Sequence, residues 1–240
     1  MPERTDGNEE VTRRLDALLT DLAQQGRRVQ SLVEAAYDAV FTDDRDAAAR
    51  LAEVDDEIDR VDVQIERASV DLLAWAVRTH TDGLTPDQLR LVLMIAKINN
   101  EFERVADTGV RVAKAVGAGS TVSQRTPGTF RVLCNSVIGI LRDSTRSVER
   151  LDEQTARTVL DSEDVVESFK AALVRDLQRD ATSGALGAEQ AITLSDIANQ
   201  SVTMADHCTN IAQQVIYART GRVYRHEEGR WEQLRIDAGE

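Results

Sequence analysis

The sequence predicts an all-α protein of two tandem three-helix bundles, formed by six long antiparallel helices. Three observations support this fold class. Aromatic residues make up only 4% of the 240 residues and there are only three prolines, whereas helix-forming residues are plentiful. Apolar residues recur at alternating steps of three and four, which is the spacing of a helical bundle. Finally, the pattern of helices occurs twice along the chain.

The first half of the chain contains three segments with helical periodicity. We expect the first helix over about residues 11–41, followed by the turn "TDDRD" and a second helix. A third helix should begin at Pro86, with Thr85 as its N-cap, and end at Gly117. The apolar seam of the second helix is expected to comprise Leu51, Val54, Ile58, Val61, Ile65, Ala68, Leu72 and Trp75.

Three further helices follow a Gly/Ser/Thr/Pro-rich segment at residues 117–128. One begins near Phe130, one contains Val159, Val166 and Leu173, and the last spans about Ala188–Thr220. The sequence therefore predicts one repeat over residues 8–118, a second over 126–222, and a polar tail over 223–240. Each bundle is small, so we expect the two to pack against one another.

Net charge and hydropathy exclude several classes of protein. The formal net charge is −13, which disfavours binding to nucleic acid and to anionic membrane surfaces. No apolar run approaches the roughly 20 residues needed to span a bilayer, and the N-terminus lacks the apolar core of a secretory signal. The two cysteines form no CxxC motif. These features predict a cytoplasmic protein with no membrane insertion.

Acidic residues at helical spacing are the main candidates for a functional site. Glu103 and Asp107 are four residues apart and share a helix face beside the apolar seam, as do Asp55 and Asp59 on the preceding helix. If the two helices are adjacent, these four carboxylates converge on one surface, and hard cations prefer such oxygen clusters. The alternative is an ordinary solvated face, since chance alone should give roughly seven acidic pairs at this spacing.

The internal repeat favours the metal interpretation. A shift of 108 residues places Glu163 on Asp55 and Glu167 on Asp59, and a shift of 99 places Asp206 on Asp107. The position of Glu103 is taken by Val202, so the second set of acids lacks one member. We therefore expect the first set to be the stronger candidate.

Several segments resemble the PhoU family of phosphate-uptake regulators. They are "DDEID" at residues 55–59, "NEFERVAD" at 100–107, and "NQSVTMADHCTNIAQQVIYARTG" in the last helix. The resemblance covers about residues 8–222 and implies the fold described above. It also implies metal ions bound by acid pairs, here at a first site of four acids and a second of three, with magnesium, manganese or iron favoured over zinc. The implied metal ligands are Asp55, Asp59, Glu103, Asp107, Glu163, Glu167 and Asp206.

The same resemblance implies a regulatory function without catalysis. Members of the family dampen phosphate uptake by acting on a phosphate ABC transporter, here expected through its ATPase, and on a membrane sensor kinase. We also expect a homodimer. Two alternatives stay open: a helical adaptor or oligomerisation protein that binds no metal, and a carboxylate-bridged metalloenzyme, which the outward position of the acids disfavours.

Overall fold

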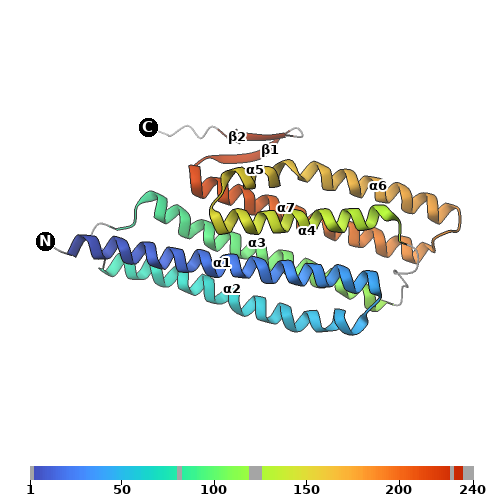
Figure 1. Cartoon of the computed structure of the whole chain (residues 1–240), viewed down its shortest axis with the longest axis horizontal. Coiled ribbons are helices and arrows are strands. Elements are labelled where there is room, and N and C mark those ends of the chain that lie inside the picture. Colours follow the sequence, from blue (N-terminus) through green and yellow to red (C-terminus); the bar gives the residue numbers. More distant parts are fainter. Residues whose placement is uncertain (1–2, 80–82, 119–125, 228–229, 235–240) are drawn as a thin grey trace.

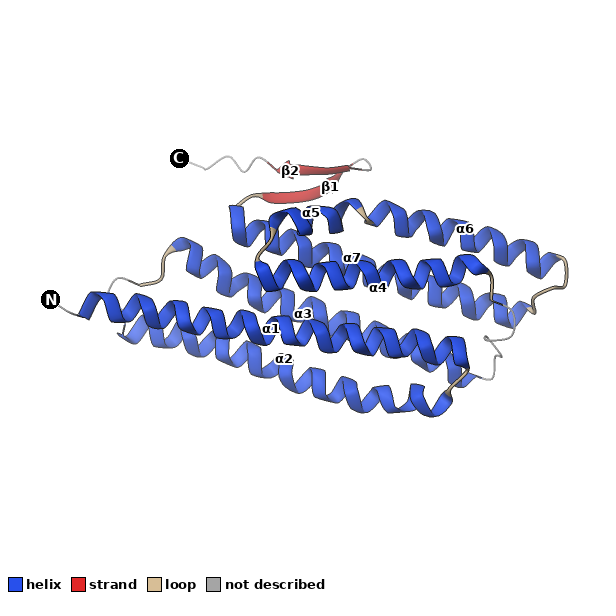
Figure 2. Ribbon diagram, in the orientation of Figure 1, coloured by secondary structure: helices blue, strands red, loops and turns tan. Residues whose placement is uncertain are grey.

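The computed structural model describes residues 3–79, 83–118, 126–227 and 230–234. Within these ranges the long helices run side by side along the long axis of the molecule, and a two-stranded sheet lies near the C-terminus (Figures 1 and 2). The predicted all-α fold class is confirmed. The elements are α1 (Glu3–Thr42), α2 (Arg45–Thr79), α3 (Pro86–Lys114), η1 (Ala115–Ala118), α4 (Gly128–Arg150), α5 (Glu153–Asp161), α6 (Glu163–Thr182), α7 (Ala188–Thr220), β1 (Val223–Glu227) and β2 (Arg230–Leu234).

The two repeats share one hydrophobic core. Helices α1, α2 and α3 pack together, as do α4, α5, α6 and α7, and the contacts α1–α4 and α3–α7 join the two groups. Large side chains from both repeats, such as Phe102, Phe130 and Leu194, are fully buried in the same cluster. The expectation that the bundles pack against one another is therefore confirmed. In the described part of the chain, no helix combines the length and the apolar character needed to cross a membrane.

A glycine allows the close approach of helices where the repeats meet. A Cβ atom on Gly26 of α1 would lie 2.7 Å from Cζ of Phe102 on α3 and 2.8 Å from Cγ2 of Thr145 on α4. Separations below 3.0 Å are repulsive, so only a glycine permits this packing without displacement of its neighbours.

Two predicted helix boundaries are confirmed by their caps. The hydroxyl of Thr85 accepts a hydrogen bond from the backbone N–H of Gln88, and the Gln88 side chain accepts one from the Thr85 N–H, which is a capping box. At the other end of the second repeat, α7 finishes at Thr220 because Gly221 adopts a φ of +69°.

The predicted fifth helix is interrupted. It is divided at Ser162 into α5 and α6. The Ser162 hydroxyl donates a hydrogen bond to the carbonyl of Thr158, and Glu163 and Asp164 follow directly. That bond turns the Ser162 side chain back onto α5, so Ser162 makes no N-cap hydrogen bond to α6, and the acids in the first turn favour the start of α6 instead.

The buried face of α2 is narrower than predicted. Leu51, Ile58 and Ile65 are buried, as expected, but Val54 and Ala68 are exposed, and assigning them to the seam was wrong. Helix α2 lies at the edge of the bundle and packs mainly against α1 and α3, so its buried face is a narrow stripe, which Ser69 and Ala76 join near its C-terminal end.

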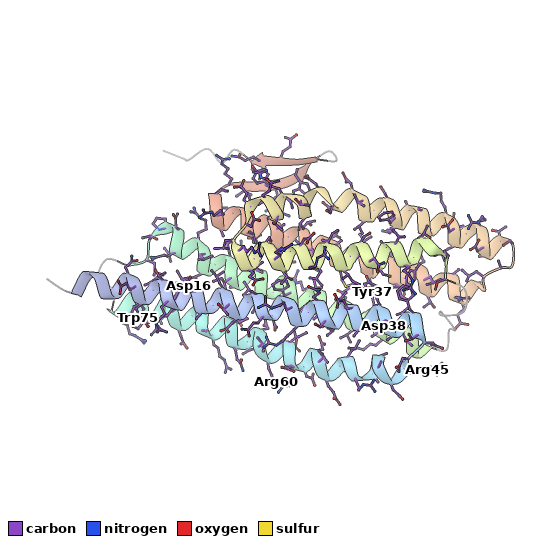
Figure 3. The ribbon with its side chains drawn as sticks, in the orientation of Figure 1. Asp16, Tyr37, Asp38, Arg45, Arg60 and Trp75 are labelled. Carbon is purple, nitrogen blue, oxygen red and sulfur yellow. The ribbon has the colours of Figure 1, made fainter. Side chains whose placement is uncertain are left out.

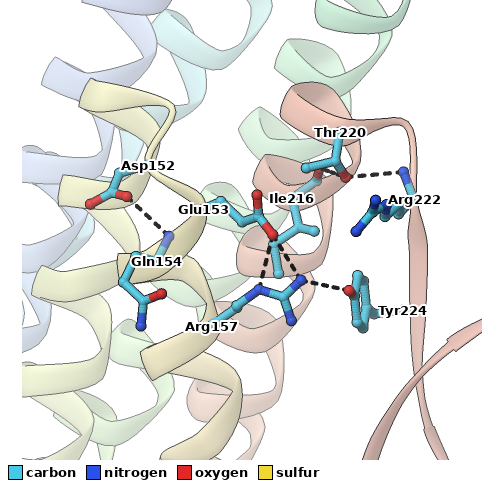
Figure 4. Close-up of polar contacts among 8 residues, drawn as sticks. All are labelled: Asp152, Glu153, Gln154, Arg157, Ile216, Thr220, Arg222 and Tyr224. Atoms are coloured by element: carbon cyan, nitrogen blue, oxygen red, sulfur yellow. Dashed lines mark hydrogen bonds and ion pairs between the residues drawn. The ribbon is translucent and has the colours of Figure 1, made fainter.

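The segment after α7 forms a β-hairpin, where the sequence predicted only a polar tail. Strands β1 and β2 pair antiparallel, and the hairpin is anchored to α5 by two side chains. The guanidinium of Arg157 donates to the hydroxyl of the buried Tyr224 at 2.5 Å (Figure 4), and the indole N–H of Trp231 donates to the carbonyl of Leu160 at 3.1 Å. These contacts fix the hairpin against the second repeat.

Candidate functional site

The structure brings together the four acids of the first predicted site. Asp55 and Asp59 lie on α2, and Glu103 and Asp107 lie on α3, which packs against α2. We call these four residues the α2–α3 acid cluster. Burial raises the pKa of Asp55 to about 6, and the charges of Asp59 and Asp107 contribute to the same shift. The prediction that these carboxylates converge is supported by this mutual repulsion.

Asp59 and Glu103 show the same effect. Burial and the charge of Asp107 raise the pKa of Asp59, and burial, Asp107 and Asp59 raise the pKa of Glu103. Each pKa is raised because a carboxylate loses water and faces like charges. A cation at this surface would relieve both costs at once.

One carboxylate oxygen of the cluster has no hydrogen-bond partner within the described ranges. Oδ1 of Asp55 is buried and accepts no hydrogen bond from any residue that the structure describes. A buried carboxylate oxygen without a partner is costly, and a metal ion would provide that partner. With the side chains as they stand, however, no three His, Cys, Asp or Glu residues among those described are arranged to hold an ion. Binding would therefore require side-chain rotation.

Two basic residues compete for the same acids. Nη2 of Arg111 lies 3.5 Å from Oδ2 of Asp107, and the charge of Lys114 lowers the pKa of Asp55. The side chains of Arg111 and Asp107 are about half exposed, at 57% and 45%. An exposed ion pair of this length contributes little, so it presents a small barrier to a divalent ion.

Asp62, which was not predicted as a ligand from the sequence, extends the cluster. Asp62 lies on α2 seven residues after Asp55, and burial, Glu66 and Asp59 raise its pKa. Nδ2 of Asn99 on α3 donates to Oδ1 of Asp62 at 2.6 Å. The spacing of residues 55, 59, 62 and 66 places all four acids along one helix face, and this signal was present in the sequence.

The second predicted site is less favourable. Asp206 on α7 is exposed, but the surrounding protein atoms displace part of its water. This desolvation and the charge of Glu167 raise the pKa of Asp206. His207 and Lys170 act in the opposite direction. Glu163, the third acid of this set, begins α6.

Val202 occupies the position that matches Glu103 in the first repeat. Its side chain is only 8% exposed and packs with the hydrophobic core. The structure thus brings Glu167 close to Asp206. However, Lys170 lies near these acids, and the apolar side chain of Val202 takes the position of a further ligand.

Comparisons with known sequences identify the repeated unit. The PhoU domain profile matches residues 22–116 and again 130–215, one match in each repeat. The phosphate-specific transport system accessory protein PhoU of Escherichia coli (strain K12) is 25% identical over 216 residues, covering 90% of this chain and 87% of that protein. A PhoU homolog of Xylella fastidiosa (strain 9a5c) is 28% identical over 208 residues, covering 86% and 85%.

Solved structures show the same fold. The crystal structure of the phosphate transport system regulatory protein PhoU from Streptococcus pneumoniae superposes with a TM-score of 0.79 at 19% identity, covering 89% of this chain and 98% of that one. The crystal structure of PhoU from Pseudomonas aeruginosa gives a TM-score of 0.78 at 22% identity, covering 88% and 99%. The fold and both profile matches agree with the sequence resemblance, and the chain belongs to the PhoU family.

Proposed function

We propose that this chain regulates phosphate uptake and phosphate homeostasis as an accessory protein of a phosphate ABC transporter. The observation that carries the proposal is the match of the PhoU domain to both repeats, together with relatives named as phosphate transport accessory proteins that align over most of their length. In this proposal the chain acts in the cytoplasm as a homodimer, contacts the transporter ATPase and a phosphate sensor kinase, and dampens uptake.

Capture of the transporter ATPase tests this role directly. Full-length tagged protein, expressed in its own cells, should retain the ATPase of the phosphate transporter through washing, whereas an unrelated ABC ATPase should be lost. Deletion of the gene should raise phosphate uptake in phosphate-rich medium. Unchanged uptake together with repeated failure to retain the ATPase would contradict the proposal.

We further propose that the α2–α3 acid cluster binds magnesium, manganese or iron ions. The unsatisfied Asp55 oxygen and the raised pKa values of Asp55, Asp59 and Glu103 support this assignment. The residues Asp55, Asp59, Glu103 and Asp107 would supply the ligands. A weaker site would involve Glu163, Glu167 and Asp206.

Metal content separates this proposal from its alternative. Wild-type protein and the double variant Asp55→Ala/Glu103→Ala are dialysed against each metal, and bound ion is measured by mass spectrometry. Asp16→Ala/Asp38→Ala is the matched control, because it removes two exposed acids of α1 that Figure 3 labels. We expect bound metal in wild type and in the control, with most of it lost in the cluster variant. Equal metal content in all three proteins would contradict a site at the cluster.

A helical adaptor without metal is the second candidate function. The observation in its favour is that no three metal-ligating side chains of the described residues are arranged to hold an ion. On this interpretation the ATPase would be captured equally by wild type and by Asp55→Ala/Glu103→Ala, and neither protein would bind metal.

A further inference from the structure

A polar pocket lies where α3, α7 and strand β1 meet, and none of its lining residues is a predicted metal ligand. Its volume is about 470 Å³. Two of its lining side chains are cations, Lys97 of α3 and Arg225 of β1. Four more carry amides, namely Asn100, Asn210, Gln213 and Gln214. We call it the α3–α7 pocket. Its wall therefore combines positive charge with many neutral hydrogen-bond donors.

Neither cation forms an ion pair with an acid among the described residues. Among the described residues, neither Lys97 nor Arg225 has a carboxylate within the 4.0 Å of an ion pair. This holds although Arg225 stands opposite Glu232 in the hairpin register. In a chain with a net charge of −13, two such cations at one pocket indicate a local preference for an anion.

One carboxylate also lines the pocket, and it is held in place. Oε2 of Glu101 lies 2.7 Å from Nδ1 of His207 and accepts a hydrogen bond from Nδ2 of Asn210 at 3.3 Å. The side chains of Glu101 and His207 are only 17% and 15% exposed. Nε2 of Gln213 donates in turn to Oδ1 of Asn210. A fixed hydrogen-bond acceptor at an otherwise donor-rich pocket disfavours an anion that has no proton to donate.

We propose that the α3–α7 pocket binds inorganic phosphate in its protonated form. Lys97, Arg225 and the amides take the anionic oxygens, and Glu101 accepts the hydrogen bond from the P–O–H group. Sulfate has the same tetrahedral shape as phosphate and the same charge as HPO₄²⁻, but it carries no proton at neutral pH. One of its oxygens would therefore face the Glu101 carboxylate without a hydrogen bond. A site that uses a ligand hydroxyl in this way rejects an analogue that lacks it.

The biological meaning of this site rests on the proposed function, because it would give a regulator of phosphate uptake a ligand of its own. Its existence is tested without the transporter. If purified protein fails to bind phosphate but retains the transporter ATPase, only the pocket proposal fails. If purified protein binds phosphate but does not retain the transporter ATPase, only the proposed function fails and the pocket proposal stands.

Calorimetric titration of the full chain provides the test. The protein is dialysed into phosphate-free buffer with a chelator, so that metal ions cannot recruit the anion. We expect saturable binding of phosphate, and affinity for sulfate weaker by about tenfold or more. Lys97→Met and Arg225→Gln should each weaken phosphate binding by about tenfold, whereas Arg50→Gln, which removes an exposed cation of α2, should leave it unchanged.

Glu101→Gln tests the basis of selectivity. It keeps the size of the side chain but replaces a pure acceptor by a group that can also donate, so the affinities for phosphate and sulfate should approach each other. No binding of phosphate by wild type, equal binding of sulfate, or unchanged binding in Lys97→Met and Arg225→Gln would overturn the proposal. Tighter binding of adenosine monophosphate would overturn the assignment to inorganic phosphate.

Discussion

Asp55 is the residue whose charge has the clearest consequence for stability. Its pKa in the folded chain is about 6, compared with an ordinary value of 3.8, so between these pH values the folded protein binds more protons than the unfolded chain. Stability must therefore fall as the pH rises through this interval. The favourable contribution of Asp55 to the free energy of unfolding is complete below pH 3.8 and is lost above pH 6.

We predict that Asp55→Asn is more stable than wild type at pH 7 and nearly equal to it at pH 3.8, because the neutral amide resembles the protonated acid. Urea unfolding in a chelating buffer at several pH values would measure this difference. Asp16→Asn, at an exposed position on α1, is the control and should show no such trend. A loss of stability at pH 7 in Asp55→Asn would show that the charge of Asp55 is favourable in the folded chain.

Individual residues show what the sequence could establish about the site. The acids at 55, 59, 103 and 107 were found because their spacing is a local property and because three of them have acidic counterparts in the second repeat. The contact between Asn99 and Asp62 depends on how α2 faces α3, which spacing alone does not determine. The same is true of the contact between His207 and Glu101, which joins helices of different repeats.

At the scale of elements, helix ends with a clear chemical signal were predicted well. Helix α7 ends at Thr220 as expected, because Gly221 provides the left-handed residue. The break at Ser162 was missed because apolar residues continue at helical spacing across it, from Val159 to Val166. The hairpin was missed because its short strands are mostly polar and the contacts of Tyr224 and Trp231 lie far away in sequence.

The packing of α1 against α3 and α4 leads to a second prediction. Gly26→Ala should destabilise the protein by about 1–3 kcal/mol, because the new methyl group meets the rigid ring of Phe102 and the side chain of Thr145. Gly139→Ala in α4 is the matched control. A Cβ there has no neighbour within 4 Å, so this change should stabilise the helix by about 0.5–1 kcal/mol. Chemical denaturation of both variants would check the opposite signs.

At the scale of the whole molecule, a buried hydrogen bond joins the two repeats. The hydroxyl of Tyr37 on α1 lies 2.8 Å from Oγ of Ser201 on α7, and both side chains are buried (Figure 3 labels Tyr37). Ser201 donates its single hydroxyl hydrogen to the carbonyl of Ile197. Tyr37 must therefore be the donor in the bond between the repeats.

This geometry predicts that Tyr37→Phe lowers the stability of both repeats together. Losing one buried hydrogen bond while keeping the ring should cost about 1 kcal/mol, which corresponds to a fall in Tm of about 3 °C for a chain of this size. Two reporters can follow the two repeats separately, because the sequence has only two tryptophans, Trp75 in α2 and Trp231 in β2. Each is observed by fluorescence in a background where the other is replaced by Phe.

Because the repeats share one core, both reporters should give the same Tm in the absence of further changes, and Tyr37→Phe should lower both by the same amount. Tyr217→Phe is the control, because among the described residues its hydroxyl has no hydrogen-bond partner, and its ring is contacted by Arg90. If only the Trp75 signal shifted, the repeats would unfold independently. The shared core would then not couple them, and the Tyr37–Ser201 contact would stabilise the first repeat alone.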